Sequence, residues 1–187
     1  MIPIKNKKKN LEDTIEELRK FAYNYTDKFA PSKQQLKIYL LKKYLNFKAA
    51  NIKKSNISDL IDIIIEDLEK SKFINDKFYS ESKAKNLIQK GSSINKIRKY
   101  LINKGIGEKY IQNTIDGIQE RNEDQDFFSA IKVCKKKRIG PSRDDSNRPL
   151  FYKKDMGVLA RSGFDLEVSK RVMDIEKEEY LKIINFL

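Results

Sequence analysis

The sequence predicts an all-α protein, built as an elongated array of three degenerate three-helix repeats with about nine helices in total. Apolar residues recur at helical spacing along most of the 187 residues, and no strand-like alternation of useful length occurs. The segment 32–43 returns 61 residues later as 93–104, with a leading serine, a Tyr-Leu-aliphatic run and a lysine in register. The frame Leu-x-x-x-Gly at 101–105 returns at 159–163, each time followed by an apolar residue. Long periods of helical segments are typical of modular arrays, which present extended surfaces for partners.

The period divides the chain into a tail and three repeats. We expect a basic N-terminal tail at 1–9, repeat one at 10–72, repeat two at 73–121, and repeat three at 122–187 with a basic Gly/Pro loop at 139–149.

Three helices are predicted in repeat one. Apolar residues at three- and four-residue spacing line one face of a helix over residues 11–29. A second helix begins at Ser32, where Gln35 completes a capping box. A polar stretch at 46–56 separates it from a third helix over residues 57–68.

Repeat two is predicted to begin at Asn75, a residue type that favours the N-cap position. Its first helix ends near Lys90, its second spans 93–104, and its third spans about 107–118. Gly105 lies between the last two, where glycine readily takes the left-handed conformation that ends a helix.

Repeat three is predicted to start with a helix over residues 123–138. The Gly/Pro-containing loop at 139–149 interrupts it. A helix over about 151–162 and a last helix capped by Asp165 complete the repeat.

Charge and cysteine usage restrict the class of protein. The chain has 40 basic and 27 acidic residues, a net charge of +13, which favours polyanionic partners such as nucleic acid. Cys134 is the single cysteine, and its helical spacing from Phe127 and Ile131 predicts a place in the core. The Lys-rich start is not followed by an apolar stretch, and the longest apolar run, 60–65, is too short to span a membrane. We expect a soluble cytoplasmic protein, a monomer with no membrane partner.

Groups that support catalysis are scarce in the sequence. There is no histidine, which removes the usual general base and the commonest metal ligand, and one cysteine cannot build a zinc site. The acidic pairs are adjacent in sequence, so on a helix they diverge by about 100° and do not converge on one metal. No glycine-rich phosphate loop occurs. We therefore expect a protein that is not an enzyme and binds no cofactor or metal.

A basic stretch in repeat three is the clearest candidate for a binding surface. Residues 130–154 contain nine basic and two acidic residues. A run of solvated charge at a helix end, where it favours the helix dipole, is one interpretation. A contact surface for phosphates or for an acidic protein face is the other.

Repeat two carries a competing signal. The spacing of Leu101, Gly105 and Ile111 is that of a helix-turn-helix, whose second helix enters the major groove of DNA. However, the position occupied by Leu101 is usually small, and the expected recognition helix at 108–113 has one basic residue. Both features argue against a sequence-specific repressor, which we keep as one alternative.

Several motifs in order resemble the RecX regulatory proteins of bacteria, over nearly the whole chain. They are Phe73 to Phe78, Lys90-Gly91, the segment Ile97 to Ile106, the stretch Lys136 to Arg143, and Leu159 to Phe164. The chain departs from that pattern where Asn75-Asp76 replaces paired aspartates, Phe78-Tyr79 replaces a Phe-Ala pair, and Lys83 and Lys85 replace an arginine.

The resemblance implies a non-enzymatic modulator of the RecA recombinase. Such a protein lies in the helical groove of the RecA filament and interferes with ATP turnover, filament extension or strand exchange, and so with recombination and the SOS response. Single- and double-stranded DNA are further partners, because the groove also holds DNA. A general basic nucleic-acid-binding protein remains the alternative. The candidate RecA or DNA contacts are Lys90, Arg98, Lys104, Lys135, Lys136, Lys137, Arg138, Arg143, Arg148, Lys153, Lys154 and Arg161.

Overall fold

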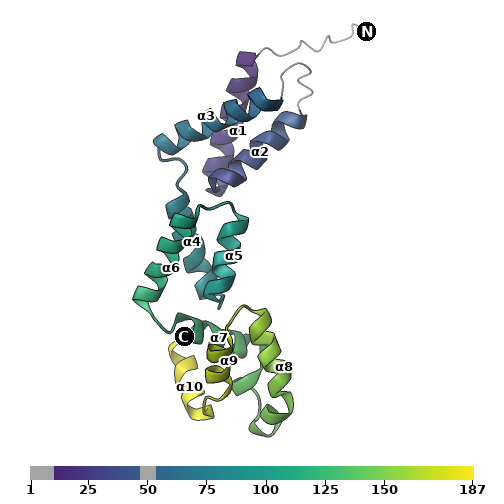
Figure 1. Cartoon of the computed structure of the whole chain (residues 1–187), viewed down its shortest axis with the longest axis vertical. Helices are drawn as coiled ribbons and strands as arrows, with labels where there is room; N and C mark the ends of the chain where they lie inside the picture. The colour runs from purple at the N-terminus through teal and green to yellow at the C-terminus, as the bar shows by residue number, and fades with distance from the viewer. Residues whose placement is uncertain (1–10, 47–53) are drawn as a thin grey trace. The chain divides into compact units, whose positions relative to one another are not determined.

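A computed structural model describes residues 11–46 and 54–187, and Figure 1 shows that the regular elements among these residues are all helices. The helices are α1 (Leu11–Phe29), α2 (Lys33–Asn46), α3 (Lys54–Lys70), α4 (Asp76–Gln89), α5 (Ile94–Asn103), α6 (Glu108–Arg121), α7 (Gln125–Lys137), α8 (Arg148–Arg161), α9 (Leu166–Met173) and α10 (Lys177–Phe186). Two short 3-10 turns, η1 (Gly140–Ser142) and η2 (Asp145–Asn147), lie between α7 and α8. The all-α prediction is confirmed for the described residues, whereas the predicted basic tail at 1–9 and most of the polar stretch at 46–56 lie outside them.

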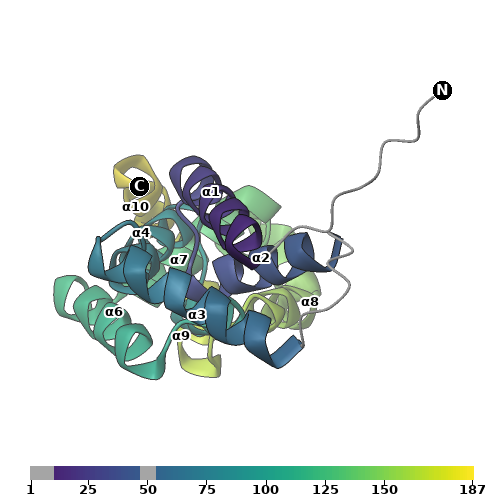
Figure 2. The same ribbon diagram turned by 90° about the horizontal axis from the view of Figure 1, so that it is seen from above.

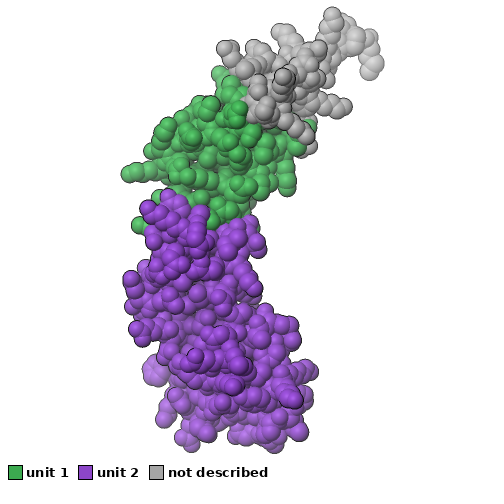
Figure 3. All heavy atoms as spheres, in the orientation of Figure 1, with its two compact units in different colours: residues 1–79, 104–106 green, residues 80–103, 107–187 purple. Residues whose placement is uncertain are grey.

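The chain divides into two compact units, coloured separately in Figure 3. Unit 1 comprises residues 1–79 and 104–106, and unit 2 comprises residues 80–103 and 107–187. Parts of the predicted second repeat therefore belong to each unit. The three-repeat boundaries stay a prediction.

The core of unit 1 forms where α1, α2 and α3 pack side by side, as Figures 1 and 2 both show. Leu18 and Ala22 of α1, Leu36 and Leu40 of α2, and Ile61 of α3 are almost completely buried. These positions repeat every three or four residues, which is why the periodicity of the sequence identified the helices and their inward faces.

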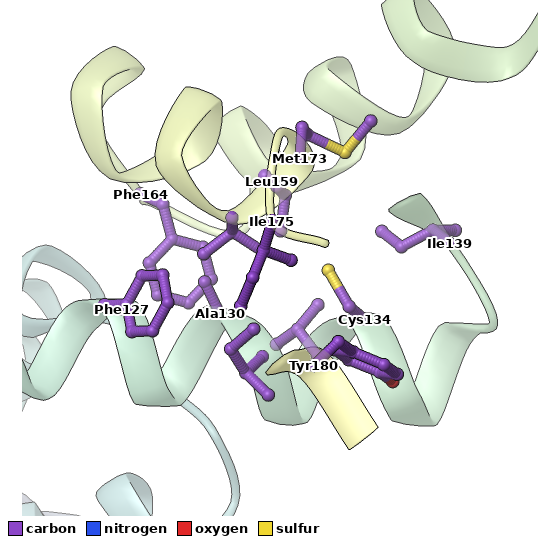
Figure 4. Close-up of a cluster of buried hydrophobic side chains, with 12 residues drawn as sticks. Phe127, Ala130, Cys134, Ile139, Leu159, Phe164, Met173, Ile175 and Tyr180 are labelled. Carbon is purple, nitrogen blue, oxygen red and sulfur yellow. The ribbon is translucent and has the colours of Figure 1, made fainter. Parts of the chain in front are cut away.

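The core of unit 2 is built mainly from α7, α8, α9 and α10, and Figure 4 shows its side chains. Cys134 lies within it and is fully buried beside Ile139 and Tyr180, as its spacing predicted. Burial raises the pKa of the Cys134 thiol to about 12. The cysteine therefore acts as a small apolar core residue.

The predicted helix caps are present. The Gln35 amide donates to Ser32 Oγ at 3.2 Å, and Gln35 Oε1 accepts from the Ser32 amide at 3.2 Å, which is a complete capping box. Asn75 Oδ1 accepts from the Phe78 amide at 3.0 Å, and Asp165 Oδ1 accepts from the Val168 amide at 2.7 Å. Each cap satisfies a backbone donor that the first turn of a helix leaves without a partner.

A second set of contacts at Ser32 links segments far apart in the sequence. Ser32 is fully buried, and its hydroxyl donates to the Lys104 carbonyl at 2.7 Å. The Lys33 amide donates to Asp76 Oδ1 at 3.0 Å. Gly105 follows with φ +71, and a Cβ at this position would collide with the Gln34 side chain. We call this arrangement of buried serine, aspartate and left-handed glycine a serine joint. All of it lies in unit 1.

Unit 2 contains the same serine joint. Ser93 is fully buried, and its hydroxyl donates to the Ser162 carbonyl at 3.0 Å. The Ile94 amide donates to Asp126 Oδ1 at 2.7 Å. Gly163 follows with φ +92, and a Cβ there would lie 2.5 Å from Ser93 Oγ. The repeat detected in the sequence is therefore a repeat of contacts as well as of residue types.

The end of the chain differs from the prediction, because the expected last helix is divided into α9 and α10. Arg148 is the reason: its Nη2 donates to the Met173 carbonyl at 2.8 Å and to the Ile175 carbonyl at 2.7 Å. Ile175 is buried between the two helices. The carbonyls that end α9 thus find a side-chain partner 25 residues or more away, which local sequence patterns do not reveal.

The serine joint of unit 2 predicts opposite effects for two glycine substitutions. G163A should lower the free energy of unfolding by more than about 1 kcal/mol, because alanine is strained at positive φ and its Cβ meets Ser93. G117A should raise it by about 0.5–1 kcal/mol, because Gly117 lies inside α6 with open space around it. Urea unfolding followed by circular dichroism measures both. Equal effects of the two substitutions would contradict the joint.

Candidate functional site

The basic end of α7 is solvent-exposed. Lys135, Lys136 and Lys137 occupy the last turn of the helix, and Arg138 follows in the left-handed conformation with φ 54. All four residues are exposed. Their charge lies at the helix C-terminus, where it interacts favourably with the helix dipole and also stays available to a partner.

Asp155 fixes the loop that follows this basic end onto α8. The carboxylate is almost fully buried, and it accepts two hydrogen bonds from Arg143, at 2.6 Å from Nε and 2.9 Å from Nη2. It also accepts from the Gly140 amide at 2.9 Å. Burial alone would raise the pKa of Asp155, but the bonds from Arg143 and Gly140 outweigh it and hold the pKa below its ordinary value. The anchored Gly140 is two residues from Arg138, so the basic end of α7 is held to α8.

Arg143 and Arg148, two of the predicted contact residues, hold segments of unit 2 together. Arg143 forms the bidentate pair with Asp155 and lies over the Phe151 ring at 4.3 Å from its centroid. Arg148 binds the carbonyls at the end of α9. Since the donors of both guanidinium groups serve internal contacts, they are not included in the contact surface that we propose below.

The predicted contacts on α8 remain exposed. Lys153, Lys154 and Arg161 all face solvent. Lys154 and Arg161 are seven residues apart and so share a face of the helix. Lys154 Nζ lies 5.7 Å from the centroid of the Phe151 ring, which brings it and Arg143 to the same aromatic side chain.

The predicted contact residues in repeat two differ in their exposure and in their partners. Lys90 is exposed just after α4. Arg98 pairs with Glu108 at 2.5 Å and donates to Gln112 Oε1 at 2.8 Å. Lys104 is half-buried, and its carbonyl accepts from Ser32 in the joint of unit 1.

The helix-turn-helix hypothesis concerns helices α5 and α6. Leu101 and Ile111 are buried and Gly105 has positive φ, as that motif requires. In the expected recognition helix, however, polar side chains bind other side chains of the protein. Glu108 pairs with Arg98, and Gln112 bonds both Arg98 and Asp116. A helix with this surface is poorly suited to read base edges or approach phosphates.

Two residues that hold this region were not singled out from the sequence. Asp155 is one, and its only local signal is that it is the single acidic residue in α8. Lys177 is the other: its Nζ donates to the Pro141 carbonyl at 3.0 Å and to the Arg143 carbonyl at 2.8 Å. Nothing in the local sequence distinguishes Lys177 from the other lysines of the chain.

Comparison with known proteins gives two matches and no matching family model. The chain is 28% identical over 160 residues to the regulatory protein RecX of Myxococcus xanthus, which covers 84% of each sequence. A crystal structure of a regulatory protein RecX superimposes with a TM-score of 0.63 at 18% identity, over 88% of this chain and 73% of that one. The chain is therefore similar to RecX regulatory proteins along most of its length. The helical fold is therefore the RecX fold, and the resemblance seen in the sequence motifs is confirmed.

Within residues 11–46 and 54–187, none of the helices combines the length and the apolar character that a membrane crossing requires.

The anchor predicts a pH-dependent effect of Asp155→Asn. At pH 7 the substitution should lower the free energy of unfolding by about 3 kcal/mol, because it breaks a buried ion pair with Arg143. The pKa of Asp155 is lowered in the folded protein, so its stabilisation is present above the ordinary value of 3.8 and is lost as the pH falls below it. The difference in the free energy of unfolding between wild type and D155N should therefore become smaller as the pH falls below 3.8.

Urea unfolding at several pH values measures this difference. D144N is the control, because Asp144 is an exposed aspartate near the same loop. A wild-type advantage over D155N that stays constant down to pH 3 would show that the pair with Arg143 does not depend on the charge of Asp155.

Proposed function

We propose that this protein regulates the RecA recombinase by binding its filament, in the helical groove. Occupying the groove inhibits ATP hydrolysis, filament extension or strand exchange, and thereby modulates recombination and the SOS response. The proposal assigns binding and obstruction to the chain, and no reaction chemistry. The protein acts in the cytoplasm, where RecA and DNA are present.

The observation that carries the proposal is the match to a curated regulatory protein RecX along 84% of both chains. A match of that extent is not confined to one short motif. The repeat of helices also suits an extended partner, because successive units can meet successive protomers of a filament.

The exposed basic residues of repeat three supply the contact that we propose. We define the basic surface by what its members share, which is exposure and a place on α8, on α7 or at the C-cap of α7. They are Lys135, Lys136, Lys137, Arg138, Lys153, Lys154 and Arg161. A filament that carries DNA presents phosphates and acidic side chains, and either would attract this surface.

DNA-dependent ATP hydrolysis by the cognate RecA on single-stranded DNA, with this protein titrated in, tests the proposal. A parallel assay measures binding to the same DNA without RecA. Inhibition at concentrations well below those that coat bare DNA supports direct action on the filament. Inhibition that begins only when the bare DNA is saturated would instead be explained by competition for DNA.

A general nucleic-acid-binding function is the second candidate, and the net charge of +13 favours it. Salt dependence does not separate the two functions, since both are electrostatic. Dependence on RecA does. The helix-turn-helix hypothesis predicts instead a preference for one duplex sequence, and the internally paired α6 weakens it.

Charge reversal of the basic end of α7 gives a specific prediction. Changing Lys135, Lys136, Lys137 and Arg138 to Glu should raise the concentration needed for half-inhibition of RecA by about tenfold or more, because four exposed contacts become repulsive. Helical content should change little, since all four side chains are exposed and the lost interaction with the helix dipole affects only the last turn of α7.

A matched control variant shows whether the position of the reversed charges or only the change in net charge weakens the inhibition. The control variant reverses four exposed lysines outside the basic surface: Lys99, Lys109, Lys170 and Lys182. It loses the same amount of positive charge and should retain most of the inhibition. Full inhibition by the α7 variant, or equal losses in both variants, would remove the α7 end from the proposed contact.

A further inference from the structure

A row of aromatic rings lies at the surface of unit 1, formed by residues of α1 and α2. Tyr25 and Tyr39 stack with centroids 4.0 Å apart and planes 12° from parallel. Phe29 continues the row at 4.9 Å from Tyr25, tilted by 45°. Both tyrosines are half-buried, whereas Phe29 is 54% exposed. The row therefore starts against the core and ends at a ring that is open to solvent.

Lysines lie over the faces of these rings. Lys28 Nζ is 5.3 Å from the centroid of Phe29, and Lys43 Nζ is 5.6 Å from that of Tyr39. Lys43 also lies 5.1 Å from the centroid of Phe21. These distances are in the range of cation–π contacts. The rings and the positive charges thus occupy one surface.

The positive charge of α2 is compensated unevenly along the helix. The helix has four lysines and no acidic residue. The two near its start pair with carboxylates of α3, Lys33 with Glu69 and Lys37 with Asp62. Lys42 is exposed next to Lys43, so the positive charge beside the Tyr39 end of the aromatic row is less compensated than the charge near the start of α2.

We propose that this aromatic row is a binding site for single-stranded nucleic acid. A base stacks on the exposed ring of Phe29, and the neighbouring phosphates lie near Lys28 and Lys43. Stacking platforms combined with positive charge are the usual means of holding single strands without sequence preference. A duplex keeps its bases paired and cannot stack in this way, and an acidic peptide would use the lysines but not the rings.

A second exposed aromatic pair in unit 1 provides the internal comparison. Tyr23 and Phe73 meet edge to face at 5.4 Å, and Phe73 is 56% exposed. Tyr23 is two residues from Tyr25 on α1, so it points to a different side of the helix. Among the described residues, the cation–π contacts of this unit involve Phe21, Phe29 and Tyr39 and not this pair. Phe73 therefore matches Phe29 in exposure but lacks its charged setting.

Tryptophan fluorescence gives a direct test, because the chain contains no tryptophan. The variants are F29W and F73W, each in the full chain and without RecA. The ligands are a thymidine oligonucleotide and an abasic oligonucleotide of the same length. The thymidine strand should quench F29W fluorescence, and the abasic strand should quench it far less, since stacking requires a base. F73W should respond little to either strand.

Affinity provides the second readout. F29A should bind the thymidine oligonucleotide at least about fivefold more weakly than wild type, while F73A should bind as wild type does. Equal quenching by the two strands, or unchanged affinity of F29A, would overturn the proposal. So would equal quenching of F29W by polyglutamate, which would favour an acidic protein partner. Because RecA is absent from these assays, their outcome does not decide whether the protein acts on the filament.

Discussion

A buried serine at the start of a helix imposes the constraint on which much of this fold depends. Ser32 and Ser93 are both fully buried, so each hydroxyl has to find a partner inside the protein. Each finds it in a carbonyl at the end of a helix about 70 residues further along the chain. Left-handed glycines, Gly105 and Gly163, let the two segments approach closely enough for that bond. Each serine joint thus gives a hydrogen-bond partner to a carbonyl at a helix end. The same residues hold distant segments of the chain together.

The two units present surfaces with different chemistry. The groups that satisfy buried backbone, such as Asp155 with Arg143, are withdrawn from solvent, while the exposed lysines at the end of α7 serve no such contact. In unit 2 the result is a basic surface suited to phosphates and acidic side chains. In unit 1 the lysines lie instead over aromatic rings, which suits unpaired bases. The two surfaces support two proposals that can be tested apart.

Local and periodic features were predictable from the sequence, and long-range contacts were not. The capping box at Ser32 was predictable because its partner Gln35 is three residues away. The division of the last helix was missed because it depends on Arg148, at the start of α8. For the candidate site, the exposure of the α7 end followed from its charge run, but the internal role of Arg143 required knowing where Asp155 lies. The proposed partner class rests on the motifs that resemble RecX proteins, since no single local pattern encodes a docking surface.

Direct action on the RecA filament, as opposed to its DNA, is the central claim. The affinity of the protein for a preassembled RecA filament on a short single strand, compared with its affinity for the bare strand at the same salt concentration, tests it most directly. The account predicts a dissociation constant at least about tenfold lower for the filament, because RecA and DNA would both contribute contacts. Equal dissociation constants, or tighter binding to the bare strand, would contradict it and leave a general nucleic-acid-binding protein.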